Sequence, residues 1–114
     1  MHADTNTERL RPDSEYVEVA AEIFGLLADA TRIRIVLALT AGELSVGNLA
    51  DIVERSPAAV SQHLAKLRWG RIVRVRQDGN RMFYRLTDEH ARRLVAEAIM
   101  QAEHAVDEAP RHHA

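Results

Sequence analysis

The chain of 114 residues has the length of one domain, and its 46% hydrophobic but only 4% aromatic residues predict a single core of aliphatic side chains. The absence of cysteine excludes disulfides, thiolate metal sites and cysteine nucleophiles. No apolar run approaches the ~20 residues of a membrane span and no signal peptide is recognisable, so we expect a cytoplasmic protein. The net charge of −2, taken alone, argues against a nucleic-acid partner.

The first apolar pattern begins after a polar N-terminus. From residue 14, apolar residues recur at steps of three and four, which predicts a helix that ends near Leu27. Asp29 or Thr31 is a candidate N-cap for a second helix, which Gly42 ends. The expected division of the chain is a flexible N-terminal arm at 1–13, one domain for DNA binding and dimerisation at 14–107, and a histidine-containing tail at 108–114.

Two further helices follow at a short separation. Ser45 begins a third, short helix with an apolar face. The pair Ser56-Pro57 is typical of a helix start, because serine accepts a hydrogen bond as N-cap and proline fits the first helical position. This fourth helix is expected to end near Gly70.

Apolar residues then recur at every second position instead of at helical spacing. Valines alternate with arginines at 72–76, and an Asp-Gly-Asn turn at 78–80 separates this strand from a second one at 82–86. The two strands are predicted to form a β-hairpin. A Thr-Asp pair can cap a last helix, which is expected to run to about Ala105.

Four helices, a hairpin and a last helix are the order of a winged helix-turn-helix, so the expected fold class is mostly α with a β-hairpin wing (α+β). In this motif the second helix of the pair enters the major groove and its N-terminal residues meet base edges. The charge distribution agrees, because residues 61–86 contain seven basic residues and one acidic residue. We therefore predict that the helix 57–69 and the wing 72–86 bind double-stranded operator DNA.

The residue types in this segment suit DNA recognition. Glutamine can read adenine with two hydrogen bonds, serine can bond to a base or a phosphate, and small alanines allow close approach to the duplex. Lysine and arginine contact phosphates, which supply affinity rather than sequence information. For His63, a phosphate contact or simple packing stays open as an alternative. The predicted DNA-binding residues are Ser56, Ala59, Ser61, Gln62, His63, Lys66, Arg68, Arg74, Arg76 and Arg81.

Three segments resemble the ArsR/SmtB family of metal-sensing regulators. Residues 24–35 are similar to that family's L-A-D-x-T-R segment, 60–68 to its recognition helix and 78–86 to its wing. The resemblance covers about residues 15–105 and departs at the Trp-Gly-Arg of 69–71, where the family often has a small residue followed by Gly-Leu. It implies a homodimer that represses transcription and, in most members, is released from its operator by metal.

The family's thiolate metal site is missing from this chain. That site uses a Cys-x-Cys pair in the third helix, and Ser45 and Gly47 stand at the corresponding positions. Soft metals prefer thiolate ligands. This argues against a sensor of arsenite or another soft metal.

The histidines permit a geometric argument. His90 and His104 are 14 residues apart, so on a helix they share a face to within about 40° but lie about 21 Å apart along the axis. Donors at about 2.0–2.1 Å from one metal cannot span that distance. One helix therefore cannot form the site alone, and two copies packed antiparallel in a homodimer would bring His90 of one chain to His104 of the other.

The resemblance implies a metal site on the last helix whose positions map onto Asp88, His90, Gln101 and His104. Glutamine is a poor ligand, so donors from elsewhere are needed. The actinobacterial nickel and cobalt sensors of the family, which this chain resembles, imply donors near the helix end, in the tail or at the N-terminus. These further candidate ligands are Glu103, His112, His113 and His2. Glu103 ranks below His104, because it lies on nearly the opposite helix face from His90.

More than four nitrogen and oxygen donors without sulfur favour octahedral Ni(II) or Co(II), whereas tetrahedral Zn(II) on Asp88, His90, His104 and water stays open. Two rival interpretations also stay open. One is a DNA-binding regulator that senses no metal or acts with a partner protein, and the other is a winged-helix protein–protein adaptor. An enzyme is not expected, because the sequence offers no cysteine, no Gly-rich phosphate loop and no carboxylate pair on a shared face.

Overall fold

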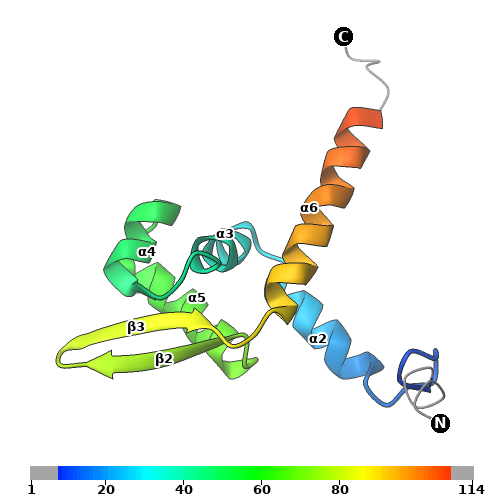
Figure 1. Cartoon of the computed structure of the whole chain (residues 1–114), viewed down its shortest axis with the longest axis horizontal. Coiled ribbons are helices and arrows are strands. Elements are labelled where there is room, and N and C mark those ends of the chain that lie inside the picture. Colours follow the sequence, from blue (N-terminus) through cyan, green and yellow to red (C-terminus); the bar gives the residue numbers. More distant parts are fainter. Residues whose placement is uncertain (1–7, 109–114) are drawn as a thin grey trace.

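The computed structural model describes residues 8–108 and has the winged helix-turn-helix fold that the sequence predicts (Figure 1). The elements in chain order are α2 (Val17–Leu27), α3 (Ala30–Leu39), β1 (Leu44–Ser45), α4 (Val46–Val53), α5 (Pro57–Trp69), β2 (Val73–Asp78), β3 (Arg81–Leu86) and α6 (His90–Glu108). Most of the predicted N-terminal arm and C-terminal tail lies outside the described residues. None of the described helices is long and apolar enough to cross a membrane.

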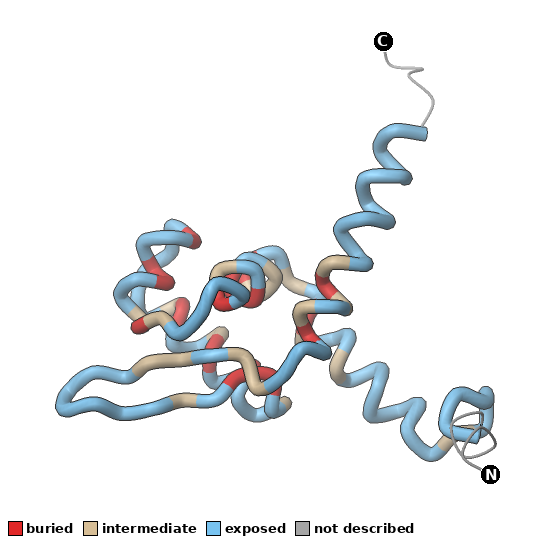
Figure 2. The backbone as a smooth tube through the Cα atoms, viewed as in Figure 1, coloured by how far each residue is buried: buried red, intermediate tan, exposed pale blue. Residues whose placement is uncertain are grey.

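The core lies where α3, α4 and α5 meet the base of the wing. Figure 2 shows that the buried residues gather in these elements and in the first turns of α6. The most deeply buried side chains are aliphatic, as the low aromatic content predicts; the largest of them are Ile35, Val36, Leu49, Val60, Leu64, Leu67 and Val73. By contrast, α2 buries only Leu27 and α6 buries only Ala91 and Val95. Within one chain, α2 and α6 therefore remain largely exposed.

Three helix starts follow the capping signals in the sequence. The side chains of Asp29, Ser45 and Ser56 each accept a hydrogen bond from the backbone N–H three residues later, at 3.0, 3.1 and 3.1 Å respectively. Each bond satisfies a donor that the first turn of a helix leaves unpaired. The capping choice between Asp29 and Thr31 is thereby decided, because Thr31 is buried inside α3.

The sheet has one strand more than the sequence suggests. The two-residue strand β1 pairs antiparallel with β3, with Leu44 opposite Tyr84, and the strand order is β1-β3-β2. The hairpin is also tighter than expected, because β2 and β3 are joined by a two-residue turn in which Gly79 has a φ of 62°. A positive φ is readily adopted by glycine, which explains its place in this turn.

The end of α5 is formed by Gly70 and Arg71, which differ in backbone conformation. A Cβ at Gly70 would lie 2.2 Å from Cδ1 of Leu26, so any larger residue at this position would force the end of that α2 side chain to move. The left-handed residue that ends the helix is the next one, Arg71, with a φ of 62°. Its N–H bonds to the carbonyl of Arg68 at 2.9 Å, and the N–H of Ile72 bonds to that of Leu67 at 2.9 Å, which is a Schellman motif. Glycine is the usual residue at this position, since a left-handed backbone costs a side-chain-bearing residue roughly 1–2 kcal/mol.

Candidate nucleic-acid interface and metal ligands

The turn between α4 and α5 fixes the two helices of the helix-turn-helix. Glu54 ends α4 in the left-handed conformation, with a φ of 57°, and the N–H of Arg55 bonds to the carbonyl of Ala50 at 3.2 Å. Ser56 then caps α5. The cap uses the Ser56 hydroxyl oxygen as an acceptor, so its proton is still available to a phosphate oxygen.

The exposed face of α5 bears the polar side chains that can meet base edges. Val60, Leu64 and Leu67 point into the core, whereas Ser61 and Gln62 are exposed on the opposite side. Their donors and acceptors can therefore reach a duplex laid against this helix. Five further predicted DNA-binding residues lie on α5 or at its cap, of which Ser56, Lys66 and Arg68 are exposed and Ala59 and His63 are half-buried.

A groove brings α4, the start of α5 and the tip of the wing together. Ser61 and Arg81 line it, although they are far apart in the sequence, and Arg55 adds a positive charge that sequence reasoning missed. The groove is lined by Ser45, Val46, Gly47, Asn48, Ala50, Asp51, Arg55, Pro57, Ser61, Asn80, Arg81 and Met82. The groove thus has two of the predicted DNA-binding residues, Ser61 and Arg81, in its lining.

His63 is held differently from its neighbours on α5. Its Nδ1 lies 3.1 Å from Nη1 of Arg32 and 3.8 Å from Oδ2 of Asp29. Arginine can only donate, so Nδ1 is the acceptor in the first contact, and Nε2 keeps the ring proton. The hydrogen bond from the backbone N–H of Arg32, with a smaller contribution from the charge of Arg32, lowers the pKa of Asp29. His63 therefore joins α5 to the start of α3 and is half-buried.

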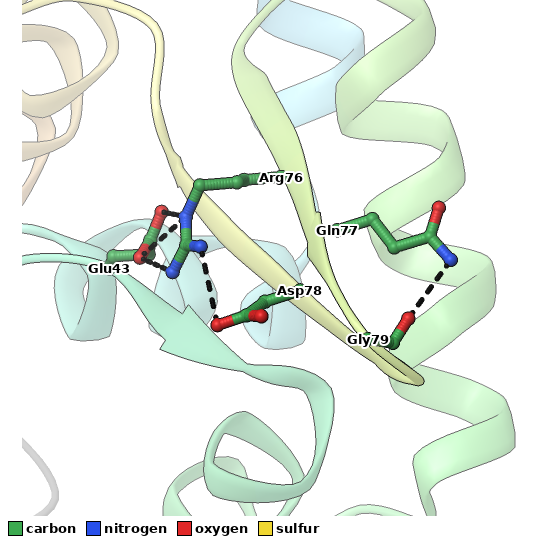
Figure 3. A network of polar contacts seen from close by, with 5 residues as sticks. All are labelled: Glu43, Arg76, Gln77, Asp78 and Gly79. Carbon is green, nitrogen blue, oxygen red and sulfur yellow. Dashed lines mark hydrogen bonds and ion pairs between the residues drawn. The ribbon is translucent and has the colours of Figure 1, made fainter.

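Arg76 on the wing is already paired (Figure 3). Its Nη2 donates to Oε1 of Glu43 at 2.7 Å, its Nε donates to Oε2 of the same carboxylate at 3.1 Å, and its Nη1 lies 3.7 Å from Asp78. The hydrogen bond from Arg76 lowers the pKa of Glu43, and the same bond raises the pKa of Arg76. A bidentate pair of this kind fixes the orientation of the guanidinium group.

The outward face of the wing is strongly basic. The register of β2 and β3 places Arg74 opposite Arg85 and Arg76 opposite Phe83. The guanidinium carbons of Arg76 and Arg81 lie 4.9 and 5.0 Å from the centre of the Phe83 ring, which is cation–π distance. Arg85 did not stand out in the sequence, because its position opposite Arg74 depends on the strand register.

Sequence reasoning also missed Trp69 as a candidate contact. The side chain is 80% exposed at the end of α5. It is seven residues from Gln62, so the two share the exposed helix face. The sequence alone does not indicate that Trp69 is exposed, because most aromatic residues lie in the core.

The candidate metal ligands on α6 are exposed and separated. His90 and His104 lie near opposite ends of one continuous helix, and Glu103 is exposed beside His104. One carboxylate oxygen of Asp88 accepts the N–H of His90 at 2.9 Å, which leaves the second oxygen for another partner. Among the described residues, no group of three or more histidine, aspartate or glutamate side chains is close enough to hold a metal ion. The other candidate ligands, His2, His112 and His113, lie outside the described residues.

Comparisons with known proteins agree with the fold and identify the family. Residues 29–75 match the family model described as "Bacterial regulatory protein, arsR family". The chain is 49% identical over 113 residues to the HTH-type transcriptional regulator KmtR of Mycobacterium tuberculosis, which covers 99% of this chain and 85% of that protein. It is 34% identical over 91 residues to the HTH-type transcriptional repressor SmtB of the same species, covering 80% and 67% of the two chains.

A solved structure extends the comparison. The homodimeric winged helix-turn-helix DNA-binding domain of a possible ArsR-family regulator from Mycobacterium bovis superposes with a TM-score of 0.73 at 25% identity, over 88% of this chain and 96% of that one. Sequence, fold and exposed basic surface thus lead to one assignment. The chain belongs to the ArsR family of bacterial regulatory proteins and is a DNA-binding transcriptional regulator rather than an enzyme.

Proposed function

We propose that this regulator is a homodimer that represses transcription from an operator, and that nickel or cobalt ions change its affinity for DNA. The observation that carries the proposal is the placement of His90 and His104 on one uninterrupted helix, α6. Because they share a face but lie about 21 Å apart along the axis, one metal can use both only if they come from different chains.

The DNA-binding part of the proposal rests on α5 and the wing. Ser61 and Gln62 are exposed and free to read bases, while Arg81 lines the same groove as Ser61. The exposed arginines of the wing supply phosphate contacts, which hold the duplex without reading its sequence. We expect a steep fall in affinity with salt, because each phosphate contact releases counterions.

The homodimer part of the proposal rests on apolar surface that one chain leaves uncovered. Phe24 on α2 is 59% exposed, and Ile99 and Met100 on α6 are exposed as well. A groove of about 320 Å³ between α2, α3 and α6 is almost entirely apolar; it is lined by Phe24, Leu27, Ala28, Ile33, Leu94, Val95 and Ala98. A second copy of the chain is the occupant that we propose, since contiguous exposed apolar surface marks an interface. The homodimeric Mycobacterium bovis domain supports this choice.

The metal part of the proposal assigns ligands between chains. Asp88 and His90 of one protomer and His104 of its partner would supply carboxylate and imidazole donors, with His112, His113, Glu103 and His2 as further candidates. Nitrogen and oxygen donors without thiolate suit Ni(II) or Co(II) in octahedral geometry, and also permit Zn(II) with fewer ligands. The resemblance to actinobacterial nickel and cobalt sensors supports the first choice.

A metal between protomers would act through linkage. A metal that binds the free dimer and the DNA-bound dimer unequally changes the DNA affinity by the same factor as DNA changes the metal affinity. Because the metal would join the two protomers, it would set the separation of the two α5 helices. That separation has to match half-sites about one helical turn apart.

The test is calorimetric titration of the purified dimer with Ni(II), Co(II) and Zn(II), each with and without promoter DNA. We expect two equal sites per dimer, tightest for Ni(II) or Co(II), and a metal affinity that DNA changes. The control is the His90→Ala/His104→Ala double variant, which should keep its fold and DNA binding but lose the metal response. Binding no tighter than micromolar for all three metals would favour the alternative, a regulator that senses no metal or acts with a partner protein. Tightest binding of Zn(II) would identify a zinc sensor instead.

A further inference from the structure

The C-terminal end of α5 leads into β2 (Figure 1). Side chains of this region line a recess of about 320 Å³. Three arginines contribute to its lining, and they come from three different local structures: Arg68 from the last turn of α5, Arg71 from the turn that follows, and Arg74 from β2. The remaining lining residues are Val73, Val75 and Thr87. The recess lies at the opposite end of α5 from the groove that contains Ser61.

The three guanidinium groups have no carboxylate to neutralise them. Within the part of the chain that the structure describes, the ion pairs of the wing involve Arg76 alone, and no ion pair involves Arg68, Arg71 or Arg74. Like charges that line one recess repel each other, and an anion bound between them would relieve that repulsion. The recess therefore has the charge of an empty anion site.

The backbone at Arg71 gives a second, independent indication. This residue occupies the left-handed position of the Schellman motif, with a φ of 62°, where glycine would be the favoured residue. The backbone conformation does not explain the choice of arginine. A requirement for its side chain at the mouth of the recess does explain it, because strained residues persist where their side chains are needed.

Thr87 adds an unused donor. Its backbone N–H bonds to the carbonyl of Ile72 at 3.0 Å, whereas its hydroxyl Oγ1 is buried and has no hydrogen-bond partner among the described residues. A buried hydroxyl without a partner is costly and rare in native structures. Thr87 also lines the recess, so rotation of its side chain would offer this hydroxyl to an oxyanion bound there.

We propose that this recess binds a phosphate oxyanion through Arg68, Arg71 and Arg74, with the Thr87 hydroxyl as a further donor. On the proposed function, on which this step rests, the ligand is a backbone phosphate of the bound duplex, beyond the bases that Gln62 reads. The C-terminal end of a helix carries partial negative charge and disfavours an anion. The site therefore depends on its arginines, and the loss of one should abolish most of the binding.

The first arm of the test measures the oxyanion by itself. Inorganic phosphate is titrated into the protein at constant ionic strength, with the arginine side-chain Nε–Hε signals followed by NMR and the fluorescence of Trp69, the only tryptophan, as a second readout. We expect the signals of Arg68, Arg71 and Arg74 to shift together and to saturate. Shifts that are equal for all arginines and never saturate would overturn the site.

Arg71→Gly is the decisive variant, because it removes one guanidinium group and relieves the left-handed strain. The variant should have a higher thermal midpoint than the wild type and yet bind inorganic phosphate at least tenfold more weakly, a combination that loss of folding cannot produce. Arg71→Lys should retain part of the affinity, and Arg34→Ala, which removes the same charge from an exposed position on α3, should retain all of it. Thr87→Val should weaken phosphate binding without lowering the thermal midpoint. Unchanged phosphate affinity in Arg71→Gly would refute the proposal.

The second arm identifies the source of the phosphate. The affinity for a mixed-sequence DNA duplex is measured at several salt concentrations, and the logarithm of the affinity is plotted against the logarithm of the salt concentration. In Arg71→Gly the negative slope of this plot should be less steep by about 0.9 for each recess that loses a phosphate contact. An unaltered slope, with phosphate binding lost in the first arm, would assign the recess to free phosphate and overturn the DNA contact. A wild type that binds no duplex at all would instead refute the proposed function, while the first arm still decides whether the recess is an oxyanion site.

Discussion

At the scale of single residues, Asp29 makes two contacts, of which the sequence predicts only the helix cap. Its carboxylate caps α3 through the backbone N–H of Arg32 and lies 3.8 Å from His63 on α5. The side chain of Arg32 completes the connection, since its Nε donates to the carbonyl of Leu26 at 2.6 Å. The start of α3, the end of α2 and α5 are thus joined by one cluster of polar and charged side chains.

We expect the Asp29→Ala variant to lose about 1 kcal/mol of unfolding free energy at neutral pH, the usual cost of removing an N-cap. Because the hydrogen bond from the backbone N–H of Arg32 lowers the pKa of Asp29 below its ordinary value in the folded state, the stabilisation by its charge is fully present above that ordinary value. It is lost as the pH falls through the lower pKa of the folded state. Urea denaturation from pH 7 down to pH 3 measures both effects.

The matched control is Asp29→Asn, which keeps an oxygen acceptor for the cap but has no charge. It should be more stable than Asp29→Ala at pH 7, and its stability should fall less steeply than that of the wild type below about pH 4. If Asp29→Asn and the wild type lose stability in parallel on acidification, then another carboxylate is responsible for the acid sensitivity.

At the scale of elements, the wing is held to the body of the domain at β1. Glu43 immediately precedes β1 and binds Arg76 in the middle of β2, while β3 lies between the two strands. The pair uses an arginine that the sequence assigns to DNA. While Glu43 is bound, Arg76 brings less net positive charge to a phosphate than Arg81 does.

Glu43→Gln should therefore raise the affinity for DNA. Because the ion pair lies at the solvent-screened surface, releasing Arg76 should change the affinity by no more than a few fold. The gain should disappear in an Arg76→Ala background, and fluorescence anisotropy on all four proteins of the double-mutant cycle measures it. A lower affinity of Glu43→Gln would show instead that the ion pair is needed to position the wing.

The elements that sequence predicts well are those defined by local signals. The caps at Ser45 and Ser56 and the change from helical to alternating spacing in the wing depend on residues close together in the chain, and the structure confirms them. The missed strand β1 has two residues and exists only through its pairing with β3. The partners of His63 and Arg76 are likewise 31 and 33 residues away, which no local pattern reveals.

At the scale of the whole molecule, a single chain leaves much of α6 exposed. Figure 2 shows that the outer half of α6 is exposed around its whole circumference and projects from the body of the domain. Such a helix gains little from burial within its own chain, although apolar residues such as Ile99 and Met100 continue along it. A second chain packed on this helix would bury them and would also bring His104 towards the partner's copy of His90.

The last prediction distinguishes a metal site between chains from one within a chain. Heterodimers are isolated with two affinity tags and titrated with Co(II), whose visible absorption reports coordination. The first heterodimer combines a His90→Ala protomer with a His104→Ala protomer. The second combines a His90→Ala/His104→Ala protomer with a wild-type protomer, so both heterodimers lack the same two side chains.

If each metal takes His90 from one protomer and His104 from the other, the first heterodimer retains one complete pair and the second retains none. Co(II) should then bind the first heterodimer at half the wild-type stoichiometry and the second only weakly. A site within one chain predicts the reverse, because only the wild-type protomer of the second heterodimer keeps both histidines. Equal binding by the two heterodimers would show that His90 and His104 do not act as a pair, and would move the site to other donors.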